Sequence, residues 1–435
     1  MNSRLDKRTV NAWAFYDWAN SAYPLVITTA IFPMFYEAIT TSEVDGVASD
    51  LVTFFGMEFK NTELYSYVAS FSFLVVSVIS PILSGIADYS DSKKEFLQFF
   101  CYFGAISCGS LYFFDVDHLE WSMLPVFTAS VGFWGSIVFY NAYLPQIAPP
   151  EAHDQISAKG YALGYIGSSI LLIANLILIM GFDVDARWAF VSVAVWWVAF
   201  AQVTYRRLPR VYAVEREVEN RFTKGWRELK KVWKQLKELK TIRRYLISFF
   251  VFSMGVQTVM LMATLFAAKE IEWGEDQAKS GLIVSVLIIQ FVAIGGAYLL
   301  SWLSARWGNI KALALTLFIW IGICVIAWFI HTPLEFYFTA GLVGLVMGGI
   351  QSLSRSTYSK LVPETKDYAS FFSFYDVLEK LGIVIGTFSY GFIEGFTGSM
   401  RNSIIALIIF FVLGLFFLYR VPGRAVIEAK SLAND

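Results

Sequence analysis

Charged and amide side chains stand inside sequence that is otherwise apolar enough to cross a membrane. In the first apolar segment, Asp17, Asn20, Ser21, Pro24 and Thr28 follow one another at i, i+3, i+4, i+7 and i+11, which is the spacing of one helix face. A carboxylate at that depth costs roughly 2.5–3.5 kcal/mol on insertion scales. We therefore expect this face to look into a watery interior, as part of a solute or proton pathway. The alternative is that it only locks two helices together.

A second group of charges lies in two later apolar segments, where Asp376, Glu379 and Lys380 share one and Arg355 stands in the other. At 1.5 Å per residue, Lys380 should lie about 15 Å from the cytoplasmic end of its span, and Asp376 and Asp17 about 9 Å. Charges of such similar depth are expected to pair. Either Asp376 and Lys380 simply neutralise each other at i, i+4, or these groups bind a solute. In the second case Arg355 or Lys380 receives a carboxylate, while Asp17 or Glu379 handles an amino group or a proton.

Three amides are further candidates for this pathway. Asn141, Gln257 and Gln351 stand in apolar stretches, where they either line a cavity or bond across helices. The full set of candidate pathway residues is Asp17, Asn20, Asn141, Gln257, Gln351, Arg355, Asp376, Glu379 and Lys380.

The composition is that of a membrane protein. Of the 435 residues, 57% are hydrophobic and only 16% are charged, whereas soluble domains carry about 25% charged residues. A net charge of −1 gives no reason to expect nucleic acid as a partner. The cysteines lie in apolar runs and the histidines near loops without ligand spacing, so neither disulfides nor a metal site is expected. The sequence shows no nucleotide-binding loop and no catalytic pair, so we expect no cofactor and no enzyme.

Twelve apolar stretches approach or exceed the roughly 20 residues that cross a bilayer. They are 11–39, 63–86, 96–114, 122–145, 158–181, 187–205, 244–268, 279–303, 312–331, 335–359, 370–394 and 402–419. The first is too long for a cleaved secretory signal and is expected to be retained. These stretches predict an all-α polytopic membrane protein with two six-helix bundles, 11–205 and 244–420. A linker, 206–243, joins the bundles, and a cytoplasmic tail, 421–435, follows them.

Basic residues gather on one predicted side of the membrane. With the N-terminus inside, the even loops and both tails hold 27 of the 34 Lys and Arg residues and the odd loops hold five. By the positive-inside rule both termini are expected in the cytoplasm, with the chain in the cell (inner) membrane. In 206–243, apolar residues recur at helical spacing between lysines. This pattern predicts a basic amphipathic helix, which either lies on the inner leaflet or is a solvated linker.

The two halves show traces of an internal duplication. At a constant offset of 213 the sequence pairs Gly135 with Gly348, Pro150 with Pro363, Glu151 with Glu364 and Ser157 with Ser370. Parallel six-helix repeats would place these pairs at equivalent positions of the two bundles.

The loop at 85–94 contains Gly85, Asp88 and Lys93 and resembles the inner-loop motif of the major facilitator superfamily. Its glycine lets helices approach, and its aspartate can contact a helix terminus or a basic residue when the inner side is closed. The corresponding stretch of the second half, 301–308, has Ser304 where the motif has an aspartate. We expect Gly85, Asp88 and Lys93 to form an inner gate, the alternative being a tight charged turn.

Three stretches resemble a particular branch of that superfamily, the vacuole effluxer family, which contains autophagy-related amino-acid exporters. They are Tyr-Asp-Trp-Ala-Asn-Ser at 16–21, Ser-Met-Gly-Val-Gln-Thr at 253–258 and Gly-Gly-Ile-Gln-Ser-Leu-Ser-Arg-Ser at 348–356. Relatives often have an acidic residue where this chain has Met254. The resemblance covers nearly the whole chain and implies the fold and a transport function.

We therefore expect a secondary transporter that moves a small polar or zwitterionic solute by alternating access. Amino acids are the leading candidates, moved by efflux, with protons as a candidate coupling ion. The alternative is an exporter of drugs, lipids or other amphipathic solutes. A lipid-modifying enzyme and a transport-dead receptor are disfavoured, because the sequence lacks a catalytic pair and keeps costly membrane charges. The expected partners are a small-molecule substrate and membrane lipids, and the expected state is a monomer.

Overall fold

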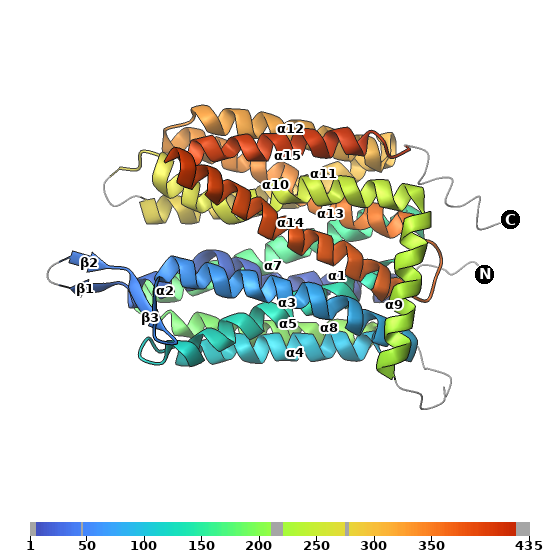
Figure 1. The fold of residues 1–435 in the computed structure, drawn as a ribbon, viewed down its shortest axis with the longest axis horizontal. Helices are drawn as coiled ribbons and strands as arrows, with labels where there is room; N and C mark the ends of the chain where they lie inside the picture. Colours follow the sequence, from blue (N-terminus) through green and yellow to red (C-terminus); the bar gives the residue numbers. More distant parts are fainter. Residues whose placement is uncertain (1–5, 45–46, 210–220, 275–277, 423–435) are drawn as a thin grey trace.

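The computed structural model describes residues 6–44, 47–209, 221–274 and 278–422. Long helices run side by side along one direction (Figure 1). In the described part of the chain, eleven helices are long and apolar enough to cross a membrane. The twelfth long helix of the predicted set is α14 (Tyr368–Thr397), whose Asp376, Glu379 and Lys380 lower its hydropathy. The predicted all-α polytopic fold is confirmed.

The first half begins with α1 (Lys7–Asn20), η1 (Tyr23–Ile31) and α2 (Phe32–Thr40), which together form one span. It continues with α3 (Asn61–Ser90), α4 (Lys93–Ser110), η2 (Leu111–Phe113), α5 (Leu119–Ala142), α6 (Leu144–Ile147), η3 (Pro150–Ala152), α7 (His153–Phe182) and α8 (Arg187–Arg207). Helix α9 (Arg221–Glu238) follows in the predicted linker, and the second half contains α10 (Lys240–Glu270), α11 (Ala278–Trp307), α12 (Asn309–Phe329), α13 (Pro333–Leu361), α14 and α15 (Met400–Leu418).

The two halves meet along a few helices. Helices α3 and α5 pack on α14, and α7 packs on α11 and α13. Within the second half, α11 and α13 come close enough that a Cβ at Gly348 would lie 2.2 Å from the carbonyl oxygen of Ala293. Such close packing of small residues is the usual way in which helices associate in a membrane. Residues 210–220 of the predicted linker and most of the predicted tail lie outside the described residues, and the predicted unit boundaries stay a prediction.

The first span is not one regular helix, because its middle section, η1, is a π-helix. Pro24 has no N–H to donate to the preceding turn, and its carbonyl accepts the hydroxyls of Thr28 and Thr29 at 2.7 and 2.9 Å. A π-turn holds more residues than an α-turn. The predicted polar face is therefore not continuous: Asp17 and Asn20 are buried in α1, but the residues beyond Pro24 follow a different phase.

Two short hairpins, which the sequence did not lead us to expect, connect the first span to α3. They pair β1 (Ser42–Val44) with β2 (Val47–Ser49) and β3 (Leu51–Phe54) with β4 (Met57–Lys60), both antiparallel. Phe55 and Gly56 close the second hairpin with φ of 48° and 76°, as a two-residue type I′ turn requires. The backbone N–H of Phe55 donates to the Glu120 carboxylate at 3.0 Å, which fixes this hairpin to α5.

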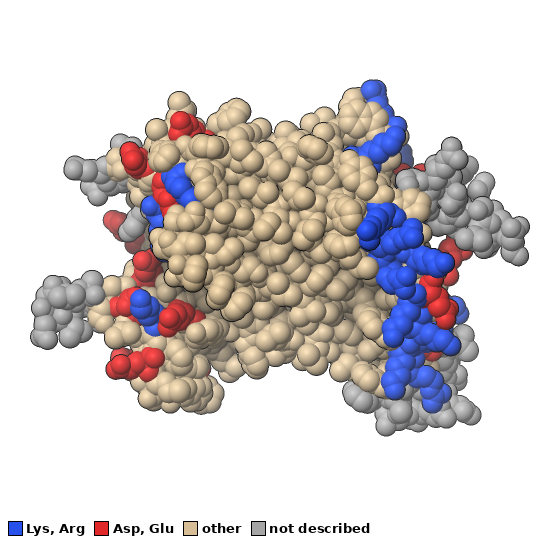
Figure 2. All heavy atoms as spheres, turned by 45° about the horizontal axis from the view of Figure 1, so that its top comes forward, with Lys and Arg blue, Asp and Glu red and all other residues tan. Residues whose placement is uncertain are grey.

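The two ends of the molecule carry different charges. Figure 2 shows Lys and Arg gathered at the end where α9 crosses the bundle, and mostly Asp and Glu at the other end. We call the first the terminal end, because α1 begins and α15 ends there, and the second the hairpin end (Figure 1).

Candidate functional site

The guanidinium of Arg355 connects the two halves inside the membrane. It lies on α13, is only 2% exposed, and its Nη2 is 3.1 Å from Oδ2 of Asp17 on α1. Its Nε donates to Oγ of Ser157 at 2.9 Å, and Nη2 also donates to the backbone carbonyl of Ser157 at 3.0 Å. Two predicted pathway residues, from stretches that are 338 residues apart, are thus brought together.

Aromatic side chains surround this ion pair. The hydroxyl of Tyr140 donates to Oδ2 of Asp17 at 2.9 Å. The centre of the Arg355 guanidinium lies 4.2 Å from the ring centre of Tyr161 and 4.9 Å from that of Trp13. Arginine stacks on aromatic faces because its charge is spread over a plane. The pair is therefore held on several sides by protein groups.

A third pathway residue, Asn141, contacts the same ion pair, and Gly160 leaves space for the Asp17 carboxylate. Oδ1 of Asn141 lies 3.5 Å from Nη1 of Arg355, at the long limit of a hydrogen bond. A Cβ at Gly160 would lie 2.3 Å from Oδ2 of Asp17. Any side chain at residue 160 would therefore push the carboxylate away from the arginine.

The second charged cluster lies on α14. The ammonium of Lys380 is fully buried, contacts Asp376, and lies 3.3 Å from Oε2 of Glu379. It also lies 3.8 Å from the ring centre of Trp134, which belongs to α5 of the other half. Glu379 in turn accepts a hydrogen bond from the Gln257 amide at 2.9 Å. The predicted Asp376–Lys380 pair is present, but it is part of a wider cluster of two carboxylates, one ammonium and an amide.

Gln351 and Asn20, the remaining predicted pathway residues, form no hydrogen bond with these clusters in the described part of the chain. The Gln351 side chain accepts the hydroxyl hydrogen of Tyr165 at 2.6 Å, again between the halves. Asn20 is buried, and within the described residues its side-chain nitrogen has no hydrogen-bond partner. In the same part of the chain, no group of three or more His, Cys, Asp or Glu side chains is arranged to hold a metal ion.

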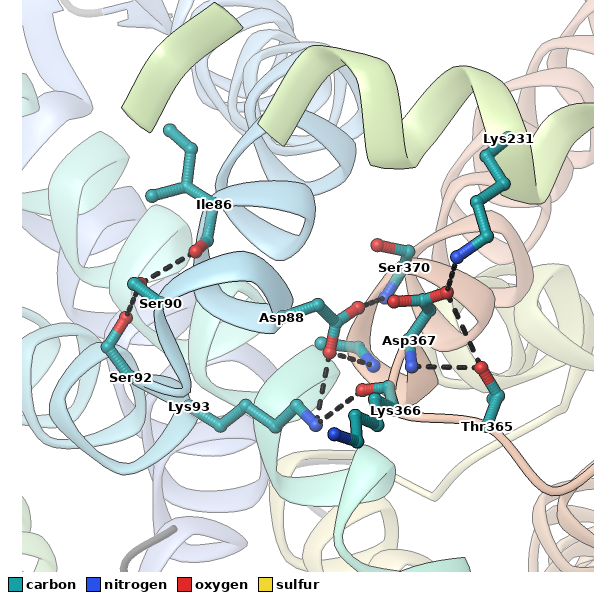
Figure 3. Close-up of polar contacts among 11 residues, drawn as sticks. Ile86, Asp88, Ser90, Ser92, Lys93, Lys231, Thr365, Lys366, Asp367 and Ser370 are labelled. Carbon is teal, nitrogen blue, oxygen red and sulfur yellow. Dashed lines mark hydrogen bonds and ion pairs between the residues drawn. The ribbon is translucent and has the colours of Figure 1, made fainter. Parts of the chain in front are cut away.

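Asp88 of the predicted inner gate contacts the start of α14 (Figure 3). Its carboxylate accepts the backbone N–H groups of Ala369 and Ser370 at 3.2 and 2.7 Å. The Lys93 ammonium lies 3.1 Å from the same carboxylate and donates to the carbonyl of Lys366 at 3.1 Å. A helix N-terminus offers unpaired N–H groups and a partial positive charge, so a carboxylate is the expected partner. The geometry is that of two half-molecules joined at the terminal end.

Helix α9 lies over this contact and touches both halves. A Cβ at Gly85 would lie 2.3 Å from the carbonyl oxygen of Gly225, so α3 and α9 cross backbone to backbone at that point. Lys231 of α9 is 2.9 Å from the Asp367 carboxylate, just before α14 (Figure 3). This hydrogen bond to Asp367 raises the pKa of Lys231.

Comparisons with known proteins agree with this geometry. The family described as "Vacuole effluxer Atg22 like" matches residues 5–430. The chain belongs to this family. The uncharacterized MFS-type transporter YxiO of Bacillus subtilis (strain 168) is 30% identical, with 98% of this chain and 97% of YxiO covered. Autophagy-related protein 22 of Yarrowia lipolytica is 23% identical, with 88% and 80% covered.

Solved structures share the fold. The major facilitator superfamily transporter FucP, in its outward conformation, aligns with a TM-score of 0.66 at 13% identity, with 96% of this chain and 99% of FucP covered. A bacterial homologue of ferroportin in an outward-facing state aligns at 0.64, with 13% identity and 96% and 99% covered. The family match and the likeness to YxiO over nearly the whole chain identify this Atg22-like chain as an MFS-type membrane transporter.

The sequence did not point to a further contact between the halves of this Atg22-like protein. Asp154, at the start of α7, accepts from Ser304 Oγ at 2.8 Å and Asn309 Nδ2 at 2.7 Å, and lies 2.5 Å from the Lys360 ammonium. Ser304 is the residue that stands where the motif has an aspartate, so the carboxylate here comes from the facing helix. The internal duplication could have pointed to it. Asp154 and Asp367 are also separated by 213 residues, so they stand at equivalent positions at the starts of α7 and α14.

Proposed function

We propose that this protein exports amino acids, or closely similar zwitterions, by alternating access. The observation that carries the proposal is the charge of the α14 cluster, in which Asp376 and Glu379 pair, among the described residues, with one ammonium, that of Lys380. One negative charge is left over in a buried place, where it is costly. The ammonium of an amino acid, or a proton, would neutralise it, and the substrate carboxylate would take a place beside Lys380.

Polar contacts support a barrier between that cluster and the terminal end. Arg355 already binds Asp17 and Ser157, so we assign it to the barrier in preference to the substrate. The Asp88 and Asp154 contacts add two further connections on the same side. For the terminal end to open, all three must break. A proton on Asp17 would weaken its attraction to Arg355, which gives a route for proton coupling.

The names of relatives and the distribution of charge support the proposed direction and location of the protein. The family is described as effluxers, and relatives are named for autophagy, which supports export. The basic terminal end supports cytoplasmic termini in the cell (inner) membrane.

The test is a ligand screen followed by transport. Purified protein is heated with single amino acids, dipeptides, sugars or amphipathic drugs, and a ligand at 100 times its Kd should add about 2.7 kcal/mol of stability. We expect amino acids to stabilise the protein and to exchange across proteoliposomes. Stabilisation by amphipathic drugs alone would favour the alternative exporter and contradict this proposal.

A further inference from the structure

A cavity of about 450 Å³ opens between α10 and α15 at the terminal end. It is lined by Arg244 and Ile247 of α10, by Phe417 of α15, and by Arg420, which follows α15. Nη1 of Arg244 donates to the backbone carbonyl of Arg420 at 3.2 Å. The guanidinium of Arg420 lies 4.4 Å from the ring centre of Phe416. Two guanidinium groups are thus held around one opening.

The positive charge of this cavity is not neutralised by described protein groups. Across residues 6–44, 47–209, 221–274 and 278–422, neither Arg244 nor Arg420 forms an ion pair. Helix α10 begins at Lys240 with no acidic residue in its first turn, and Arg243 and Arg244 follow. Because a helix N-terminus is itself positive, cations there repel it and an anion is favoured. The site calls for an anion.

The wall below the arginines is apolar and faces outward. Ile247 is 44% exposed, one turn beyond Arg244, and Leu413 is 42% exposed, one turn from Phe417. Both helices are membrane spans. Such exposed surface continues from the charged cavity toward the middle of the membrane, where acyl chains would cover it.

We propose that this cavity binds an anionic phospholipid. The phosphate lies between Arg244 and Arg420, each of which can offer a two-pronged set of donors, and one acyl chain follows Ile247, Phe417 and Leu413. Basic pockets between membrane helices, with an apolar wall below, suit an anionic headgroup. The proposal does not depend on which solute is transported.

The test measures lipid-dependent stability of the full-length protein in detergent. Thermal unfolding is followed with added phosphatidylglycerol, phosphatidylcholine or inorganic phosphate, for the wild type, Arg244→Gln, Arg420→Gln and the double variant. Lys234→Gln, on the exposed face of α9, removes the same charge elsewhere at the terminal end and serves as the matched control. We expect phosphatidylglycerol alone to raise the Tm, and each arginine substitution to weaken its binding by about 10- to 150-fold.

Three outcomes would overturn the proposal. An unchanged phosphatidylglycerol effect in the double variant would remove the arginines from the site. An equal loss in Lys234→Gln would indicate diffuse attraction to the basic surface. An equal effect of inorganic phosphate would indicate a site for free anions. If the double variant does not fold, Arg244→Lys and Arg420→Lys are used instead. They keep the positive charge but lose the two-pronged set of donors, so phosphatidylglycerol binding should be weaker than in the wild type but not lost.

Discussion

At the residue scale, the Asp17–Arg355 pair is stable only as a pair. Its two members are 5% and 2% exposed, and each charge alone would lie in a medium that solvates it poorly. Removing one partner of such a pair typically costs about 3–5 kcal/mol, because the other is left buried without compensation. Replacing both by neutral groups of similar size is often much less costly.

The first prediction uses this asymmetry. Arg355→Gln should destabilise the protein by about 3–5 kcal/mol, and adding Asp17→Asn should restore much of the loss. The measurement is a double-mutant cycle on thermal or denaturant unfolding in one detergent. Strict additivity of the two single changes would mean that the contact contributes no coupling.

Asp17→Asn alone separates two roles in transport. If Asp17 carries the coupling proton, the variant should still exchange substrate across a membrane but fail to concentrate it against a gradient. If Asp17 instead binds the substrate ammonium, binding itself should be lost. Normal uptake together with normal accumulation would make the pair purely structural.

The second prediction concerns the α14 cluster. Glu379→Gln keeps the hydrogen bond from Gln257 within reach but removes the surplus negative charge. Zwitterion binding should weaken by about 10- to 150-fold. Glu394→Gln, on the same helix but paired with Lys269 near the hairpin end, is the matched control and should bind normally. The affinity is measured by calorimetry. If Glu379→Gln binds the zwitterion as tightly as the wild type, the substrate does not bind at this cluster.

At the element scale, sequence patterns predicted the positions of the helices better than they predicted the local geometry within them. Hydrophobic length predicted twelve spans, and eleven of them coincide with described helices that are long and apolar enough to cross a membrane. The inner-loop motif singled out Asp88, which contacts the start of α14. The prediction of one continuous polar face in the first span was wrong beyond Pro24. A 3.6-residue period assumes an unbroken α-helix, whereas η1 is a π-helix. The partners of Asp17, such as Tyr140, depend on which helices become neighbours, which no local pattern encodes. The second hairpin depends instead on the local turn at Phe55 and Gly56, a signal that the helix-length argument did not use.

The third prediction tests the Asp154 contact as an element of the gate. Asp154→Ser should slow turnover while leaving substrate affinity within a few-fold, because it leaves the Lys360 ammonium buried without its carboxylate. Adding Ser304→Asp returns a carboxylate from the facing helix, and turnover should recover. Asp185→Ser, which removes an exposed pair with Arg187 at 3.8 Å, should have little effect. If the double variant turns over as slowly as Asp154→Ser alone, this cluster stabilises helix packing and is not part of the gate.

At the scale of the whole molecule, the charge count along the chain anticipated the two ends of the fold. The 27-to-5 division of basic residues among the loops becomes a basic terminal end and a mostly acidic hairpin end in space (Figure 2). The sequence predicts this difference in charge because successive loops of a polytopic chain must lie on opposite sides of the membrane. It could not rank the contacts between the halves, since those depend on the packing of helices far apart in the chain.

The orientation of these ends is the last prediction. The three native cysteines, Cys101, Cys108 and Cys324, are buried, so an impermeant thiol reagent should give little background. We expect Glu58→Cys, in the exposed hairpin strand β4, to be labelled on intact cells, and Lys234→Cys, on the exposed face of α9, only after permeabilisation. The physical reason is that lysine-rich segments stay on the cytoplasmic side during insertion. The reverse pattern of labelling would place α9 outside the cell and would contradict the proposed cytoplasmic termini.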